Sequence, residues 1–299
     1  MARLLWQQRQ DIGPAARTYA GMTFVSSKGR SLLFGGYTDS TPSFLSDTWE
    51  WDGEEWVQVA DTGPTPRVPM LTYDSARNVA VLFGGTGEDG DVFDTWEWDG
   101  EAWTQIQDEG PQAPWFSSNI VYDAARHVTV LESGSSSSFG GKGTWAWDGS
   151  AWTQLTNTGP AARQVLSLAF DSVRGRVVLF GGRDTTNLQL QKDTWEWDGV
   201  VWKQVQDIGP SPRQGSGMVG TGDDVLLFGG STEAGLLGDT WAWDGAHWRQ
   251  RQDIGPSPRH SPGMAWDAGR DRVVLFGGVS PNPTASLLVR DTWEAFEAP

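Results

Sequence analysis

Five arginines recur at one position relative to a Gly-Pro pair, three residues after the proline: Arg17, Arg67, Arg163, Arg213 and Arg259. A guanidinium group binds carboxylates and phosphates through two parallel N–H donors. On a chain of net charge −16, five such groups around one opening would form a focused positive site for an anionic or polar ligand. The alternative is that each arginine pairs with an aspartate of the fold or stacks on a tryptophan, and both roles can coexist.

A second set of candidates consists of residues that break the pattern around these arginines. One copy of the pattern has Trp115 where an arginine is expected, and its Phe-Gly-Gly is replaced by Glu132-Ser133-Gly134. Trp115 would form an aromatic wall for a ligand. Glu132 would form an ion pair with an arginine or act as an acid or base. Neutral drift in one copy is the alternative. Further non-repeating residues are expected at the same opening: Tyr19, Phe116, Gln164, Gln214 and His260.

His260 is the candidate for a general base, because histidine takes up a proton near neutral pH. A hydrogen-bonded structural role is the alternative. His127 and His247 are expected in turns on the opposite face, which argues against a histidine-based transition-metal site. The chain has no cysteine, which excludes thiol nucleophiles and thiolate metal sites. No P-loop, dinucleotide or Gly-x-Ser-x-Gly motif stands in a suitable context, so we expect no cofactor and no metal.

All of these residues belong to a repeat that runs through the whole chain. Each copy reads W-x-Q-x-x-(D/N)-x-G-P, followed by an apolar stretch. Five of the six copies continue with V-L-F-G-G or L-L-F-G-G, then a variable loop and, usually, D-T-W-(E/A)-W-D-G. The recurrence of most of the 19 tryptophans indicates packing between neighbouring units rather than a sugar-binding surface. Six copies start at intervals of 46–50 residues, at Trp6, Trp56, Trp103, Trp152, Trp202 and Trp248.

Each copy contains four strand-like runs and no helical pattern. In one copy they are Gln164–Phe170, the unbroken apolar run Arg176–Phe180, the alternating Thr194–Trp197, and Trp202–Val205 after the hairpin turn Asp198-Gly199. We therefore predict an all-β fold, a six-bladed β-propeller of four-stranded antiparallel blades.

The last copy stops after Asp291–Phe296 and lacks a fourth strand, whereas Leu4–Gln8 supplies a matching run at the other end of the chain. We predict that this N-terminal strand joins the last blade and closes the ring, which removes an open sheet edge. The chain is expected to form a single propeller domain over residues 1–299, with blades at about 16–60, 66–107, 114–156, 162–206, 212–252 and 258–297 plus 2–10.

The glycine pairs and tryptophans of these copies resemble kelch repeats over the entire chain. The resemblance implies a propeller whose first strand is innermost. It also implies a ligand face built from the loops between strands two and three and the loops between blades. Kelch propellers include adaptors, sugar-active enzymes and parts of oxidases, so the resemblance is compatible with several functions. The diglycines that carry it are Gly35-Gly36, Gly84-Gly85, Gly181-Gly182, Gly229-Gly230 and Gly277-Gly278.

The acidic composition of the chain argues against two classes of partner, nucleic acids and membranes. The net charge of −16 and a pI of about 4.5 repel phosphate backbones and anionic membranes, so neither nucleic acid nor a membrane is an expected partner. The N-terminal residues are too polar for a signal peptide, and no apolar run approaches the length of a membrane span. A cytoplasmic protein is therefore expected, with a secreted mature form as the alternative.

The leading hypothesis is a binding module that holds an anionic or polar ligand at an arginine-ringed channel mouth. One alternative is a cofactor-free enzyme, such as a sugar isomerase, an epimerase or a biosynthetic cyclase, that uses Glu132, His260 or both in the same pocket. Another is a scaffold that binds a protein or peptide through loops 37–46, 183–192 and 279–290. The predicted ligand-binding residues are Arg17, Tyr19, Arg67, Trp115, Phe116, Arg163, Gln164, Arg213, Gln214, Arg259 and His260.

Overall fold

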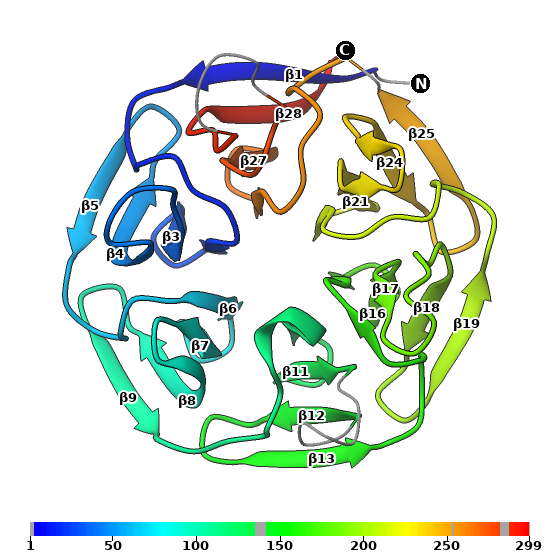
Figure 1. Cartoon of the computed structure of the whole chain (residues 1–299), viewed down its shortest axis with the longest axis horizontal. Coiled ribbons are helices and arrows are strands. Elements are labelled where there is room, and N and C mark those ends of the chain that lie inside the picture. Colours follow the sequence, from blue (N-terminus) through cyan, green and yellow to red (C-terminus); the bar gives the residue numbers. More distant parts are fainter. Residues whose placement is uncertain (1–2, 135–141, 253, 282–286, 299) are drawn as a thin grey trace.

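Six four-stranded antiparallel sheets surround a central axis in the computed structural model of the chain (Figure 1). The structure describes residues 3–134, 142–252, 254–281 and 287–298. Within these ranges the one helical element is the short 3₁₀ turn η1 (Trp115–Ser117). Each four-stranded sheet is one blade, and the predicted all-β, six-bladed propeller is confirmed. The serine-rich stretch 135–138 of the divergent copy lies outside the described residues.

The strands of blades 1 to 3 are given from the axis outwards. Blade 1 has β2 (Gly21–Val25), β3 (Arg30–Tyr37), β4 (Phe44–Trp51) and β5 (Trp56–Ala60). Blade 2 has β6 (Val68–Asp74), β7 (Val79–Gly87), β8 (Gly90–Trp98) and β9 (Trp103–Gln107). Blade 3 has β10 (Ser118–Asp123), β11 (Val128–Ser133), β12 (Gly143–Trp147) and β13 (Trp152–Thr156).

Blades 4 to 6 follow the same order. Blade 4 has β15 (Ser167–Asp171), β16 (Arg176–Phe180), β18 (Thr194–Trp197) and β19 (Trp202–Gln206). Blade 5 has β20 (Gly217–Gly220), β21 (Val225–Phe228), β24 (Thr240–Trp243) and β25 (Trp248–Gln252). Blade 6 has β26 (Gly263–Asp267), β27 (Arg272–Phe276), β28 (Thr292–Ala298) and β1 (Arg3–Gln10). Two small ribbons join β14 (Arg163–Gln164) to β17 (Arg183–Asp184) and β22 (Ser231–Thr232) to β23 (Gly235–Leu236).

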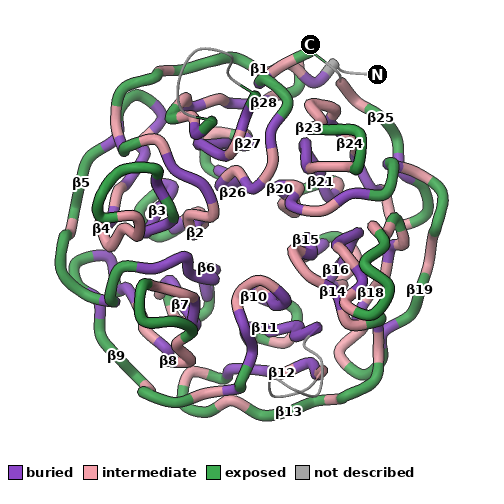
Figure 2. Tube along the Cα trace, viewed as in Figure 1, coloured by how far each residue is buried: buried purple, intermediate pink, exposed green. Residues whose placement is uncertain are grey.

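The outermost strand of each blade is its most exposed strand (Figure 2). The second strands, such as β16, are buried along almost their whole length, because a neighbouring blade covers each face of the sheet. The outer strands, such as β9, expose most of their residues. This arrangement explains why the second strand of each copy is an unbroken apolar run.

Strand β1 closes the ring by pairing antiparallel with β28, as the sequence predicted. Their register places Trp6 opposite Ala295 and Arg3 opposite Ala298. Both ends of the chain therefore lie in blade 6, next to β25 of blade 5 (Figure 1). The last blade therefore has the same four strands as the others, and β1 covers the edge that β28 would otherwise expose.

One tryptophan of each outer strand joins its blade to the preceding one. Its indole N–H donates to a threonine hydroxyl of that blade at 2.8–3.0 Å. The hydrogen bond satisfies a polar group that would otherwise be buried without a partner. All six blade interfaces contain it, through Trp6–Thr240, Trp56–Thr292, Trp103–Thr48, Trp152–Thr95, Trp202–Thr144 and Trp248–Thr194.

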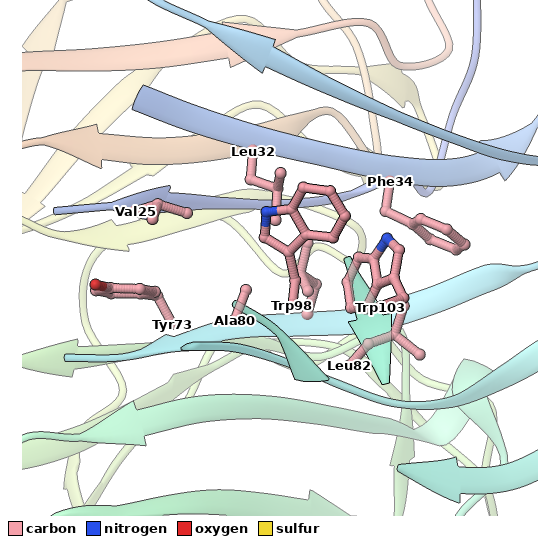
Figure 3. Close-up of a cluster of buried hydrophobic side chains, with 9 residues drawn as sticks. Val25, Leu32, Phe34, Tyr73, Ala80, Leu82, Trp98 and Trp103 are labelled. Atoms are coloured by element: carbon pink, nitrogen blue, oxygen red, sulfur yellow. The ribbon is translucent and has the colours of Figure 1, made fainter. Parts of the chain in front are cut away.

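The same tryptophans form the apolar contact between blades. Figure 3 shows the interface of blades 1 and 2, where Trp98 and Trp103 lie against Leu32 and Phe34. The rings of Phe34 and Trp103 are 5.2 Å apart, in an edge-to-face arrangement. The predicted role of the repeated tryptophans, packing between neighbouring units, is the one observed.

We expect Thr292→Val to lower the free energy of unfolding by about 1–3 kcal/mol, because it leaves the buried indole N–H of Trp56 without an acceptor. Urea denaturation measures the change. Thr104→Val, at an exposed position of β9, is the matched control and should change stability by less than about 0.5 kcal/mol. Equal effects of the two variants would contradict the stated role of the hydrogen bond.

Candidate functional site

The repeated arginines are buried in the blades, with 0–1% of each exposed. Arg213 shows the arrangement: its Nη1 and Nη2 donate to the two carboxylate oxygens of Asp239 at 2.7 and 2.9 Å. The same guanidinium group donates to the backbone carbonyls of Gly229 and Ser211, each at 3.0 Å. The indole N–H of Trp241 donates to the carboxylate of Asp239 at 2.7 Å. Arginine, aspartate and tryptophan thus form one closed unit.

Three of the other four arginines are held in the same way, whereas Arg67 donates to one oxygen of Asp94 and to the hydroxyl of Thr65. Burial by itself raises an aspartate pKa, but the donors from arginine and tryptophan hold the pKa of Asp47, Asp193, Asp239 and Asp291 below the ordinary value. The carboxylates are therefore charged and neutralise the guanidinium groups at neutral pH. The remaining pairs are Arg17–Asp47, Arg67–Asp94, Arg163–Asp193 and Arg259–Asp291.

This pairing corrects the expectation of an arginine-ringed mouth. Residues of all six blades line the central channel, and none of the five arginines is among them in the described part of the chain. The alternative, in which each arginine pairs with an aspartate of the fold, is the observed arrangement. The guanidinium groups of these five arginines are therefore buried and paired within the blades rather than presented at the channel.

Four of the predicted site residues come together at the mouth of this channel. The Trp115 ring lies 4.9 Å from the Tyr19 ring, in an edge-to-face contact. Phe116 lies 6.3 Å from Trp115, and His260 lies 6.1 Å from Tyr19. All four side chains are half-buried, so part of each ring is open to solvent. We call these residues the mouth cluster.

The longer Gly-Pro loop of blade 3 positions Trp115 and Phe116. Its chain turns through η1 and presents both rings at the channel. The Tyr19–Trp115 contact thereby joins blades 1 and 3, which blade 2 separates in the ring. His260 is held by a 3.1 Å hydrogen bond between its Nδ1 and the Ser261 hydroxyl, and burial lowers its pKa.

A series of backbone hydrogen bonds runs round the mouth. Tyr19 N–H donates to Ser261, Ser261 to Gly215, Gly215 to Val165, and Val165 to Phe116, at 2.6–3.2 Å. Tyr19, Val165 and Ser261 have φ of 49–55°, a left-handed conformation that is strained for a β-branched residue such as valine. Sequence reasoning missed Val165 and Ser261 as mouth residues. The glycine at position 215 was the available signal, because it occupies the equivalent place.

The channel below the mouth is small and lined by both polar and apolar groups. Its volume is about 200 Å³, less than the ~300–1,000 Å³ of a typical small-molecule pocket. Gln164 and Gln214 are half-buried and each precedes a mouth residue, Val165 and Gly215 respectively. The apolar wall comes from equivalent positions of the six inner strands: Met22, Leu71, Ile120, Leu168, Met218 and Met264.

Glu132 lies away from the channel, in the interface of blades 3 and 4. It occupies the register position of the phenylalanines that pack on the next blade, and 2% of it is exposed. Thr144 donates a 2.6 Å hydrogen bond to its carboxyl group. Burial raises the pKa of Glu132 to about 8, despite attraction from Lys142 and Arg163.

The acid–base pair of the enzyme alternative is therefore not assembled. Glu132 does not line the channel, whereas His260 stands beside Tyr19 at its mouth, in another blade. General acid–base catalysis requires both groups within reach of one bound substrate. Among the described residues, no group of three histidines or carboxylates could hold a metal ion. No helix in the described ranges is long and apolar enough to cross a membrane.

The variable loops surround the mouth and carry exposed apolar side chains. Tyr37 is exposed and its ring lies 5.6 Å from Phe44. Leu188 and Leu287 are each more than half exposed in two further loops. Residues 282–286, in the third of the predicted binding loops, lie outside the described residues. These side chains add apolar surface to the face that carries the mouth cluster.

Comparison with known proteins agrees with this geometry. The family model described as the KLHDC2/KLHL20/DRC7 Kelch-repeats domain matches residues 144–295, half of the chain. The chain belongs to the kelch-repeat family. A comparison with curated protein sequences finds no match to the chain. Kelch propellers commonly act as protein-interaction modules, and the loops and mouth cluster of this kelch propeller lie on one face.

Replacement of a paired arginine tests the structural role of these residues. We expect Arg213→Ala to lower the free energy of unfolding by about 3–5 kcal/mol, because it removes the hydrogen bonds of a buried guanidinium group and leaves the half-buried carboxylate of Asp239 without its cation. Urea denaturation provides the measurement. Arg249→Ala is the control, since Arg249 forms an exposed pair with Asp244 and should cost less than about 1 kcal/mol. A small effect at both positions would refute the proposed role.

Glu132 should make stability depend on pH. The unfolded chain releases this proton near pH 4.5, whereas the folded protein keeps it to about pH 8. Stability should therefore fall as pH rises between these values and level off above them. In Glu132→Gln this loss should be smaller, and denaturation midpoints at pH 5, 6.5 and 8 measure the difference. Parallel pH curves for the two proteins would show that Glu132 does not retain its proton.

Proposed function

We propose that this kelch propeller is a binding module that holds a polar segment of a partner protein across the channel mouth. The observation that carries the proposal is the mouth cluster, in which four half-buried rings from three blades converge on one opening. Exposed aromatic side chains at the centre of a concave surface are typical of binding hot spots. The neighbouring loops with Tyr37, Leu188 and Leu287 would extend the contact.

The size of the channel supports a side chain as the inserted group. An apolar cavity of ~150 Å³ is enough to hold benzene, so about 200 Å³ accommodates one large apolar or aromatic side chain. A whole small-molecule substrate would require more space. The segment would then insert one such side chain, with Tyr19 and Trp115 packed around it.

In this proposal, uncharged side chains of the propeller make the polar contacts with the bound segment. The carboxamides of Gln164 and Gln214 stand beside the mouth and can donate to or accept from a peptide backbone. An anionic ligand was expected from free guanidinium groups, which are paired here with aspartates. The net charge of −16 also opposes the approach of an anion. We therefore propose a polar, uncharged or cationic segment.

A displayed peptide library, selected on the wild-type protein, tests this proposal. We expect enriched peptides to carry an apolar or aromatic residue and to bind Trp115→Ala and Tyr19→Ala at least tenfold more weakly than the wild type. Val173→Ala, an exposed position in the turn between β15 and β16 on the opposite face, is the control and should bind normally. Peptides that bind all four proteins equally would place the binding surface elsewhere.

A further inference from the structure

The interface between blades 5 and 6 lacks a tryptophan that the other five interfaces contain. In five blades, the third strand carries a second tryptophan that pairs with the first residue of the outer strand, and 0–1% of it is exposed. The two rings of each pair are 5.5–5.7 Å apart. In blade 6 the same position, opposite Trp6, holds Ala295. The five tryptophans are Trp51, Trp98, Trp147, Trp197 and Trp243.

The acceptor on the preceding blade is replaced as well. Trp51, Trp147 and Trp243 donate their indole N–H to a glutamate of the preceding blade at 3.0–3.2 Å. Alanine takes this position in blades 3 and 5, as Ala146 and Ala242, and Ala242 lies in the same core cluster as Ala295. Both partners of the usual contact are therefore alanines at this one interface.

Two further parts of the usual contact are missing here. Elsewhere a basic side chain from the turn between the first two strands lies against the Asp-Gly turn of the next blade, as Arg174 of blade 4 lies against Gly245 of blade 5. The corresponding turn of blade 5 reads Thr221-Gly-Asp-Asp224 and has no basic residue. Blade 6 has no Asp-Gly turn, because β28 and β1 come from opposite ends of the chain.

A cavity of about 700 Å³ lies where these groups are missing. Leu4, Leu226, Val273 and Ala295 line it, and each is at least 94% buried. Trp266 and Phe296 add half-buried aromatic rings to its wall. We call it the seam cavity, because it lies at the seam where the two ends of the chain close the ring. Its apolar depth corresponds to the space that an indole fills at the other interfaces.

The polar part of the seam cavity has an excess of negative charge. Among the described lining residues, the carboxylates of Asp223, Asp224, Asp271 and Glu297 face two guanidinium groups, those of Arg249 and Arg251. Arg251 is already engaged by Asp224 at 3.7 Å and by Glu297. A ligand with a positive charge is therefore favoured over an anionic one. The Trp266 ring can also attract a cation, whereas Arg272 already lies over the Phe296 ring at 4.6 Å.

We propose that the seam cavity binds a small aromatic amine whose ring has the size of an indole. The ring would occupy the place of the missing tryptophan against Leu226 and Val273, and the ammonium group would lie towards the acidic rim. The volume of the seam cavity, about 700 Å³, lies within the ~300–1,000 Å³ range of small-molecule pockets. This site is separate from the mouth cluster and does not depend on the peptide-binding proposal.

Calorimetric titration with tryptamine, indole and indole-3-acetate tests the proposal. We expect tryptamine to bind the wild type at least tenfold more tightly than indole-3-acetate, with indole between them. Ala295→Trp should fill the cavity and weaken tryptamine binding at least tenfold. Ala295→Met fills less space and serves the same purpose if the tryptophan variant does not fold.

Trp115→Ala is the control for the location of the site, and it should bind tryptamine as the wild type does. The absence of tryptamine binding to the wild type at millimolar concentration would overturn the proposal. Equal binding to the wild type and to the folded Ala295 variant would overturn it too, because the ligand would then occupy another site.

Discussion

The hydrogen bond from an indole N–H of one blade to a threonine hydroxyl of the preceding blade is the contact on which the rest of the structure depends. A four-stranded sheet with two apolar faces cannot stand alone in water, so each blade needs a neighbour on both sides. The tryptophan supplies apolar area and a directional bond at once. Because Trp6 and Thr240 make this bond at the closing interface, the ring closes without an exposed face.

The units of arginine, aspartate and tryptophan limit which groups of the loop face can bind a ligand. Each unit satisfies a guanidinium group inside the blade and ties the start of the inner strand to the diglycine, as in the bonds of Arg213 to Asp239 and Gly229. Repeated residues with all their partners inside the fold have little left for a ligand. The chemistry of this propeller must come from the positions where the repeat is interrupted.

Two interruptions leave surface that the regular repeat would fill. In blade 3, Trp115 replaces an arginine and brings an aromatic ring to the channel mouth. Between blades 5 and 6, Ala242 and Ala295 replace a glutamate and a tryptophan and leave the seam cavity. Glu132 is a third interruption, but a neighbouring threonine satisfies it inside the core. It bears on stability and pH rather than on binding.

The sequence by itself determined the architecture, because a period of 46–50 residues with four strand signals admits few folds, and the truncated last copy required the N-terminal strand. It also singled out Tyr19, Trp115, Phe116 and His260, which do meet at the mouth. Only the tertiary structure decided that Arg213 faces Asp239 rather than solvent, since hydrogen bonding between residues 26 apart in sequence depends on how the strands register. The seam cavity likewise exists only in three dimensions, because an alanine leaves space only where its neighbours cannot move in to fill it.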